Sequence, residues 1–384
     1  MKKYAVKILS YILVALVAAS TTCVCFLYAQ KSNSGKLQEL ESLLLQCYVG
    51  EADRDALEDS AASAMVQALG DQWSYYMTAE EFLSYQETMS NSYVGVGITI
   101  QLRQDGSGLN VIDVTPGGPA EEAGLLAGDV LVAIGDTPIA GMELSEASSL
   151  IRGEEGTSVK LTVERSGERN VFQVTRRKFK TPVAVYEMLE GNVGLITIKN
   201  FDERCAEETL AAIEALRAQG AQALIFDVRN NPGGYKHELV ELLDYLLPKG
   251  PLFRAEDYRG REEVDYSDDK RLDMPMAVLV NLHSYSAAEF FAAAMDEYDA
   301  AVIVGEKTYG KGYFQNTFRL SDGSAVNLSV GKYFTPNGNS LAGVGLMPEV
   351  EVVVDEATAA QIAAGILAPE EDPQINAAID ALKS

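Results

Sequence analysis

Ser286 is the residue whose position in the sequence first suggests chemistry. It follows the apolar segment 276–280 and opens an alanine- and phenylalanine-rich stretch that begins Ser-Ala-Ala-Glu. A serine between a strand and a helix lies beside backbone N–H groups that can stabilise an oxyanion, so it is a candidate nucleophile. The same four residues form a capping-box sequence, in which Ser286 and Glu289 would only satisfy the start of the helix. Ser286 alone does not decide between these roles.

A nucleophilic serine needs a base, and the sequence offers few candidates. It contains two histidines, His237 and His283. His283 lies three residues before Ser286, so a serine–histidine arrangement stays open, whereas His237 is expected to be an exposed residue at a helix start. Lys311 is the alternative, in a loop that reads Tyr-Gly-Lys-Gly-Tyr. Burial lowers the pKa of a lysine, which would allow Lys311 to accept a proton near neutral pH.

A glycine-rich loop that reads Asp-Val-Arg-Asn-Asn-Pro-Gly-Gly supplies a third element of a catalytic site. Its two glycines, Gly233 and Gly234, allow a backbone conformation in which an N–H group points into a cavity. Together with the N–H of Ala287, the loop would form an oxyanion hole with two donors. Asp227 and Arg229 are expected to pair with each other and to hold the loop rather than to react.

The elements that must position these residues alternate between strands and helices. Strands are expected at 193–198, 223–228, 276–280 and 301–304, and helices at 204–218, 236–247 and 287–296. The continuous apolar runs in the strands are typical of a parallel sheet that is buried on both faces. A later segment, 323–335, has the pattern of an antiparallel strand, and 374–382 predicts a terminal helix. This part of the chain is therefore expected to be an α/β domain.

Residues 93–179 have a different pattern, with short strands separated by turns rich in glycine, proline and aspartate. Strands are expected at 97–101, 109–114, 130–134, 159–164 and 170–176, and short helices at 119–123 and 144–151. With the segment Gly-Pro-Ala-Glu-Glu-Ala-Gly-Leu-Leu-Ala-Gly-Asp-Val, this pattern resembles a PDZ domain in the permuted order found in bacterial proteases. A glycine-containing segment precedes a strand whose edge would be free, and its N–H groups would bind a peptide carboxylate. Its residues are Tyr93, Val94, Gly95, Val96 and Gly97.

The N-terminal part predicts a membrane anchor followed by helices. Residues 8–28 contain no charged side chain, which suits one bilayer span, and the lysines before them place that end in the cytoplasm. A cleaved signal peptide is the alternative. Residues 37–69 have helical periodicity and favour a helical platform or a homodimer contact.

The composition limits the partners. A net charge of −25 disfavours nucleic acid as a partner, because phosphates would repel the chain. Beyond the expected anchor only Cys47 and Cys205 remain, and without a disulfide framework free thiols are favoured. There is no HExxH motif and no histidine cluster, so no metal and no cofactor are expected.

Taken together, the motifs resemble those of the carboxyl-terminal processing peptidases, the PDZ-containing serine proteases with a serine–lysine dyad that are also called tail-specific proteases. The matching segments follow the family's order and extend over nearly the whole chain after residue 36. They are 70–77 (Gly-Asp-Gln-Trp-Ser-Tyr-Tyr-Met), the loop 227–234, 284–289 (Ser-Tyr-Ser-Ala-Ala-Glu), 305–312 with Gln315, and 333–338 (Tyr-Phe-Thr-Pro-Asn-Gly).

The resemblance implies that Ser286 is the nucleophile, that Lys311 is the general base and that Gln315 orients the lysine. It also implies that the PDZ domain binds a substrate C-terminus and controls access to the dyad. His283 and Tyr285 stand where the family usually has small residues, and Asn230 stands where glycine is common. These departures leave the substrate preference open.

We therefore expect a mostly parallel, crotonase/ClpP-like α/β protease core at 180–384 with a PDZ domain inserted before it at 91–179. An N-terminal helical region at 31–90 and a transmembrane anchor at 1–30 precede them. The expected function is that of a serine endopeptidase of the bacterial cell envelope that cleaves extracytoplasmic proteins near their C-termini. The rival hypothesis is an inactive scaffold that kept the protease fold and only binds peptides.

Overall fold

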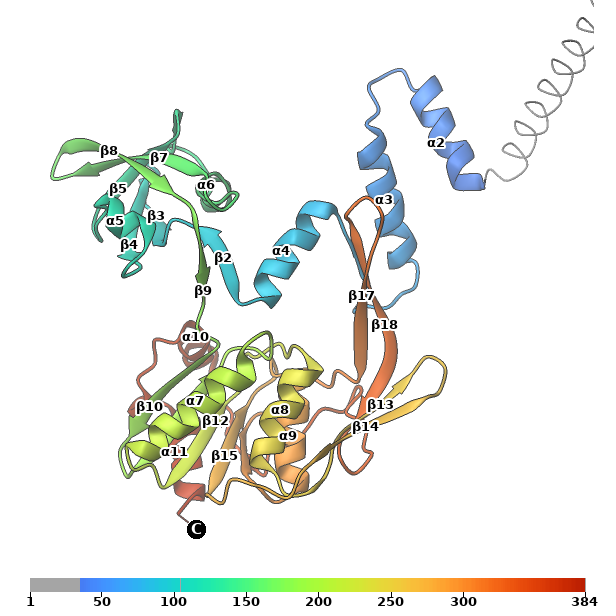
Figure 1. The fold of residues 1–384 in the computed structure, drawn as a ribbon, viewed down its shortest axis with the longest axis vertical. Helices are drawn as coiled ribbons and strands as arrows, with labels where there is room; N and C mark the ends of the chain where they lie inside the picture. The colour runs from blue at the N-terminus through green and yellow to red at the C-terminus, as the bar shows by residue number, and fades with distance from the viewer. Residues whose placement is uncertain (1–34, 104, 384) are drawn as a thin grey trace, which may run out of the picture.

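The computed structural model describes residues 35–103 and 105–383, and Figure 1 shows their arrangement. The predicted anchor at 8–28 and the alternative of a cleaved signal peptide lie outside these residues. Among the residues described, no helix combines the length and the apolar character needed to cross a membrane.

Two helices cover the periodic stretch at 37–69. They are α2 (Lys36–Cys47) and α3 (Arg54–Gln67), and the chain between them is extended at Asp53, whose carboxylate accepts from the N–H groups of Asp55 and Ala56 and so caps α3. Neither helix contains a buried residue, and four leucines of α2 are exposed. Strand β1 (Tyr75–Met77) and helix α4 (Ala79–Met89) follow.

The PDZ unit is a small sheet with its own apolar core. Its strand order is β3-β4-β5-β7-β8, and β6 pairs with β5. Leu109, Leu131 and Leu161 lie at the centre of this core and are fully buried. The elements are β3 (Ile98–Leu102), β4 (Leu109–Val114), α5 (Pro119–Ala123), β5 (Val130–Ile134), β6 (Thr137–Pro138), α6 (Leu144–Ile151), β7 (Ser158–Arg165) and β8 (Glu168–Thr175). In Figure 1 the unit is joined to the rest by the antiparallel pair β2 (Ser92–Gly95) and β9 (Arg177–Lys180).

A six-stranded sheet with the order β10-β11-β12-β15-β16-β19 forms the centre of the larger domain. All its neighbouring strands are parallel except the edge strand β10. Side chains alternate between its faces, so Ile196 and Phe226 pack with α7, α8 and α9, whereas Leu195 and Ile225 pack against α11. The elements are β10 (Ala184–Leu189), β11 (Val193–Ile198), α7 (Cys205–Ala218), β12 (Ala223–Asp227), α8 (Lys236–Leu246), β15 (Met276–Val280), α9 (Ala287–Glu297), β16 (Val302–Gly305), β19 (Val350–Glu351), α10 (Glu356–Ala364), the short 3-10 helix Pro369–Glu371 and α11 (Pro373–Ala381).

A second, antiparallel sheet stands beside the first, as Figure 1 shows. It contains β1, β13 (Gly250–Asp257), β14 (Glu262–Ser267), β17 (Tyr313–Arg319) and β18 (Ala325–Phe334). Strand β18 confirms the strand predicted at 323–335, but the hairpin of β13 and β14 was not predicted. The strand β1, from the N-terminal region, pairs with β18 and so brings residues 73–77 to the catalytic domain.

Candidate active site

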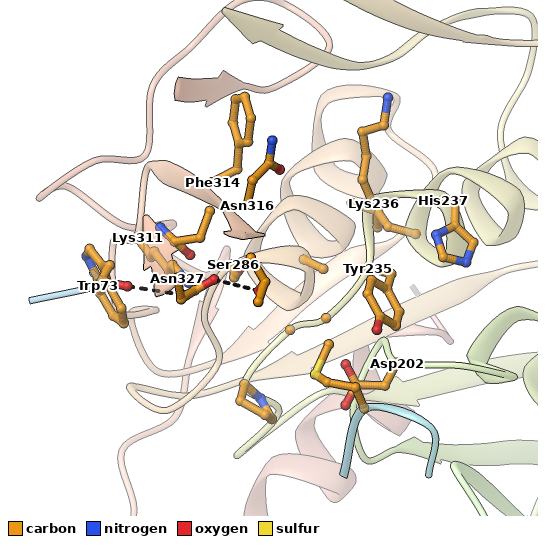
Figure 2. A pocket seen from close by; sticks show the side chains of 18 of the residues that line it. Trp73, Asp202, Tyr235, Lys236, His237, Ser286, Lys311, Phe314, Asn316 and Asn327 are labelled. Atoms are coloured by element: carbon orange, nitrogen blue, oxygen red, sulfur yellow. Dashed lines mark hydrogen bonds between the residues drawn. The ribbon is translucent and has the colours of Figure 1, made fainter. Parts of the chain in front are cut away.

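Ser286 lies at the turn between β15 and α9, in a backbone conformation that non-glycine residues rarely adopt. Its φ is 59° and its ψ is −127°. The turn is held to the neighbouring loop, because the Ser284 hydroxyl donates to the carbonyl of Val228 at 2.7 Å and the Tyr285 N–H donates to the carbonyl of Asn231 at 3.2 Å. Ser286 is thus fixed at the N-terminal end of α9, and its side chain lines a cavity (Figure 2).

Glu289 connects this turn to the lysine loop. It is fully buried, and one of its carboxylate oxygens accepts from the N–H of Ser286 at 3.2 Å and from the N–H of Lys311 at 2.9 Å. The other oxygen accepts from the Thr308 hydroxyl and from the N–H of Gly310, each at 2.6 Å. The spacing from Ser286 predicted the first contact, but the contacts with residues 308–311 could not be found from the sequence.

Lys311 lies between Glu289 and an aromatic cluster, in a partly buried position. Its ammonium is 4.4 Å from the ring centroid of Trp73, as Figure 2 illustrates, and Trp73 in turn contacts Tyr285 and Tyr309, with centroids 6.1 and 5.6 Å away. Burial lowers the pKa of Lys311 to about 8, while the negative charges of Glu289 and Asp71 act in the opposite direction. This pKa leaves a useful fraction of neutral amine near physiological pH.

A cavity of about 1050 Å³ brings the predicted site residues together. Ser286, Lys311 and Gln315 line it, as do the three predicted backbone donors Ala287, Gly233 and Gly234. The Gln315 amide donates to the Tyr313 carbonyl and to the Ser329 hydroxyl, both at 3.1 Å. In this conformation it therefore links the start of β17 to Ser329 on β18. The cavity also includes Trp73 and Tyr333, which sequence reasoning did not place in the site.

The glycine loop lies directly against Ser286. A Cβ on Gly233, whose φ is +88°, would stand 2.7 Å from the Cβ of Ser286 and 2.8 Å from the nitrogen of Ala287. The Gly233 N–H donates to the side chain of Asn231 at 2.8 Å. Among the described residues no acceptor takes the N–H of Gly234 or of Ala287. The geometry therefore favours Gly234 and Ala287 as the oxyanion donors.

The predicted pairing of Asp227 and Arg229 is confirmed and extends further along the chain. The guanidinium contacts both oxygens of Asp227, at 2.9 and 2.6 Å, and also donates to Asp372 and Gln374, both at 2.8 Å. Asp372 caps α11, so the buried arginine ties the end of β12 to the terminal helix. This network supports the loop that carries Gly233.

Neither histidine is placed to act on Ser286. His283 is exposed and does not line the cavity. His237 begins α8 as predicted, with a side chain that is 68% exposed, and it contacts Glu238 and Tyr235 at the rim. His237 shares the cavity with Ser286, but its largely exposed ring contacts Tyr235 and Glu238, so Lys311 is the favoured candidate base.

The predicted peptide-binding segment 93–97 is divided between two elements. Tyr93 stacks on Phe179 with ring centroids 5.3 Å apart, and Ser92–Gly95 pairs with β9 in the connection to the catalytic domain. Val96 is buried in the PDZ core, and Gly97 leads into β3, which has β4 as its one neighbour among the described strands. The free edge of β3 therefore remains the place where a peptide strand would add.

The α/β core, the PDZ unit and the serine at a helix start define a PDZ-containing serine protease. Residues 192–352 match the model of peptidase family S41, and residues 111–165 match that of the PDZ domain. The carboxy-terminal processing protease CtpA of Bacillus subtilis is 35% identical over 323 residues, which cover 83% of this chain and 69% of that protein. The chain therefore belongs to peptidase family S41, among its carboxy-terminal processing serine proteases.

Two further comparisons agree. A CtpA-like serine protease of Staphylococcus epidermidis is 33% identical over 327 residues, which cover 84% of this chain and 66% of that protein. The crystal structure of a Bacteroides fragilis protein assigned to the S41 proteases superposes with a TM-score of 0.54 and 18% identity, over 89% of this chain and 95% of that one. At that identity the likeness concerns the fold alone.

Proposed function

We propose that this protein is an endopeptidase that uses Ser286 and Lys311 as a catalytic dyad and cleaves proteins outside the cytoplasm near their C-termini. One observation carries the proposal. A lysine whose pKa is about 8 shares a cavity with a serine at a helix N-terminus, and a buried carboxylate fixes the backbone of both. A lysine with this pKa can accept a proton near neutral pH.

In the proposed mechanism, the neutral amine of Lys311 takes the proton of the Ser286 hydroxyl as the serine oxygen attacks the scissile carbonyl. The N–H groups of Ala287 and Gly234 bind the oxyanion, and the lysine then donates its proton to the departing amine. Water hydrolyses the acyl-enzyme with the lysine again acting as base. Because the ammonium lies against Trp73 in this conformation, the lysine side chain turns toward Ser286 for the transfer, and Gln315 orients it there.

The remaining parts of the chain have supporting roles in the proposal. The PDZ unit binds the C-terminus of the substrate along β3 and controls its access to the cavity. Residues 8–28 hold the enzyme in a membrane with the catalytic domain outside the cytoplasm. The exposed leucines of α2, which include Leu37, Leu40 and Leu43, support a homodimer through the N-terminal helices.

The dyad is tested with two substitutions and a matched control. Ser286→Ala and Lys311→Ala should each abolish cleavage of an unfolded protein substrate, and Ser286→Ala should also abolish labelling by a fluorophosphonate. Lys307→Ala removes an exposed lysine from the same loop and should leave the rate unchanged. Full activity in Lys311→Ala would refute the dyad, and a loss caused by His283→Ala alone would assign the base to histidine.

The same experiment distinguishes the rival function. An inactive scaffold would bind peptides, yet the native protein would neither cleave them nor react with the fluorophosphonate at Ser286. The lowered pKa of Lys311 argues for the enzyme, because a scaffold that only binds peptides has no use for a neutral amine in its cavity.

A further inference from the structure

Asp202 differs from every other buried carboxylate in the described part of the chain. The others each accept at least two hydrogen bonds. Asp129 is paired with Arg165, whereas both Asp227 and Asp372 are paired with Arg229. Glu238 accepts from the N–H groups of Arg204 and Ala206, and Glu289 accepts from the four donors described above. Asp202 is only 6% exposed, and none of the described residues donates a hydrogen bond to its carboxylate. The Asp202 oxygens are not sealed inside the protein but reach the cavity, so a ligand in the cavity can supply the donors that the described residues do not.

The carboxylate of Asp202 lines the same cavity as Ser286. Figure 2 shows it beside Tyr235, on the opposite side of the view from Lys311. Its backbone is fixed against the glycine loop, because a Cβ on Gly234 would lie 2.6 Å from the Asp202 nitrogen and the Phe201 N–H donates to the Gly233 carbonyl at 2.7 Å. A substrate that lies along this loop therefore passes Asp202.

The surroundings of Asp202 are suited to a cation with an apolar stem. Burial, and then the neighbouring carboxylates Glu238 and Glu203, raise its pKa to about 7. Among the described residues no positive charge offsets these effects on the pKa of Asp202, because Lys236, which also lines the cavity, pairs with Glu263 and Asp265 instead. The cavity wall nearby includes Tyr85, Met89 and Tyr235, which can cover methylene groups and face a cation with their rings or sulfur.

We propose that Asp202 forms a specificity subsite that binds a lysine or arginine side chain of the substrate, close to the bond that is cleaved. The substrate cation supplies the hydrogen-bond donors that the described residues do not provide at this position. The subsite gives the proposed protease a preference for substrates with a basic residue near the cleavage site. This cleavage preference rests on the proposed function, whereas binding of the basic side chain does not.

The binding test uses the Ser286→Ala protein, so that its result does not depend on catalysis. Fluorescent alanine-rich peptides carry one lysine that is moved through every position, and a matched set carries norleucine, which keeps the stem without the charge. At about pH 8, above the pKa of about 7 for Asp202, at least one lysine peptide should bind about tenfold more tightly than its norleucine counterpart. Adding Asp202→Asn should reduce its affinity to that of the norleucine peptide.

Glu207→Gln is the control, because it removes a carboxylate from the exposed first turn of α7 outside the cavity and should leave the lysine preference intact. Equal affinities for all lysine and norleucine pairs, or a preference that persists in Asp202→Asn, would overturn the subsite. Cleavage of the same peptides by the native protein is measured separately. If the native protein cleaves none of them and does not react with the fluorophosphonate, the proposed function fails, while the binding comparison still decides the role of Asp202.

Discussion

The charge of Asp71 should contribute to the pH at which the proposed enzyme becomes active, because it acts on the pKa of Lys311. Asp71 acts on Lys311 through its negative charge, which favours the ammonium and raises the lysine pKa. The replacement Asp71→Asn removes this charge. It keeps an oxygen for the N–H of Trp73, which donates to Asp71 at 3.1 Å, so the turn that carries Trp73 should persist. The pKa of Lys311 should therefore fall below about 8.

The size of the effect follows from the fraction of neutral lysine. At a pKa of about 8 the neutral fraction at pH 7 is roughly a tenth. Loss of one partly solvated charge is expected to lower the pKa by about half a unit, or ~0.7 kcal/mol, which raises that fraction to roughly a quarter. At about pH 9 both proteins are almost fully in the neutral form. Asp71→Asn should thus be two- to threefold faster near pH 7 and unchanged near pH 9.

The assay is kcat/KM for a fluorogenic peptide between about pH 6 and pH 10. The native protein should gain activity through about pH 8, because only the neutral amine accepts a proton. The rise of the Asp71→Asn profile should come at lower pH. Glu356→Gln, which removes one exposed charge at the start of α10, controls for the change in net charge. A native profile that is flat or falls between pH 7 and 9, or an Asp71→Asn profile displaced to higher pH, would refute this role of the lysine.

Three further substitutions test other parts of the site. Gly233→Ala should lower kcat/KM by at least about a hundredfold, because its Cβ would lie 2.7 Å from that of Ser286, whereas Gly191→Ala, with open space around it at φ +79°, should leave the rate unchanged. Arg229→Met leaves the buried carboxylates of Asp227 and Asp372 without their cationic partner. It should reduce the free energy of unfolding by about 3–5 kcal/mol in urea titrations. Trp73→Leu removes the aromatic face beside the ammonium, so the midpoint of the pH profile should fall by up to about one unit, and Trp73→Phe should restore part of it.

The fold of the catalytic domain could be predicted where the apolar pattern is strong. Met276–Val280 forms β15 with the predicted bounds, and Pro119–Ala123 and Leu144–Ile151 form the two PDZ helices as predicted. The hairpin of β13 and β14 was not predicted, because both strands contain many charged residues. The two strands are stabilised by pairing with each other, and β13 also pairs with β18.

The candidate site could be predicted only in part, because its residues meet through long-range packing. Local motifs indicated Ser286, Lys311 and the glycine loop, and one cavity contains them all. Trp73 reaches the lysine because β1 pairs with β18, a contact that joins residues some 250 positions apart in the sequence. Asp202 stands out because none of the described residues donates a hydrogen bond to its carboxylate, and a missing donor leaves no pattern in a sequence.

Glu289 shows why the two interpretations of Ser-Ala-Ala-Glu need not exclude each other. As a capping residue it accepts the N–H of Ser286, but a cap requires only one of its oxygens. The second oxygen and the remaining lone pairs hold the loop that carries Lys311. The same buried negative charge raises the lysine pKa against the effect of burial. One carboxylate thus fixes the backbone of both Ser286 and Lys311 and also favours the ammonium form of the proposed base.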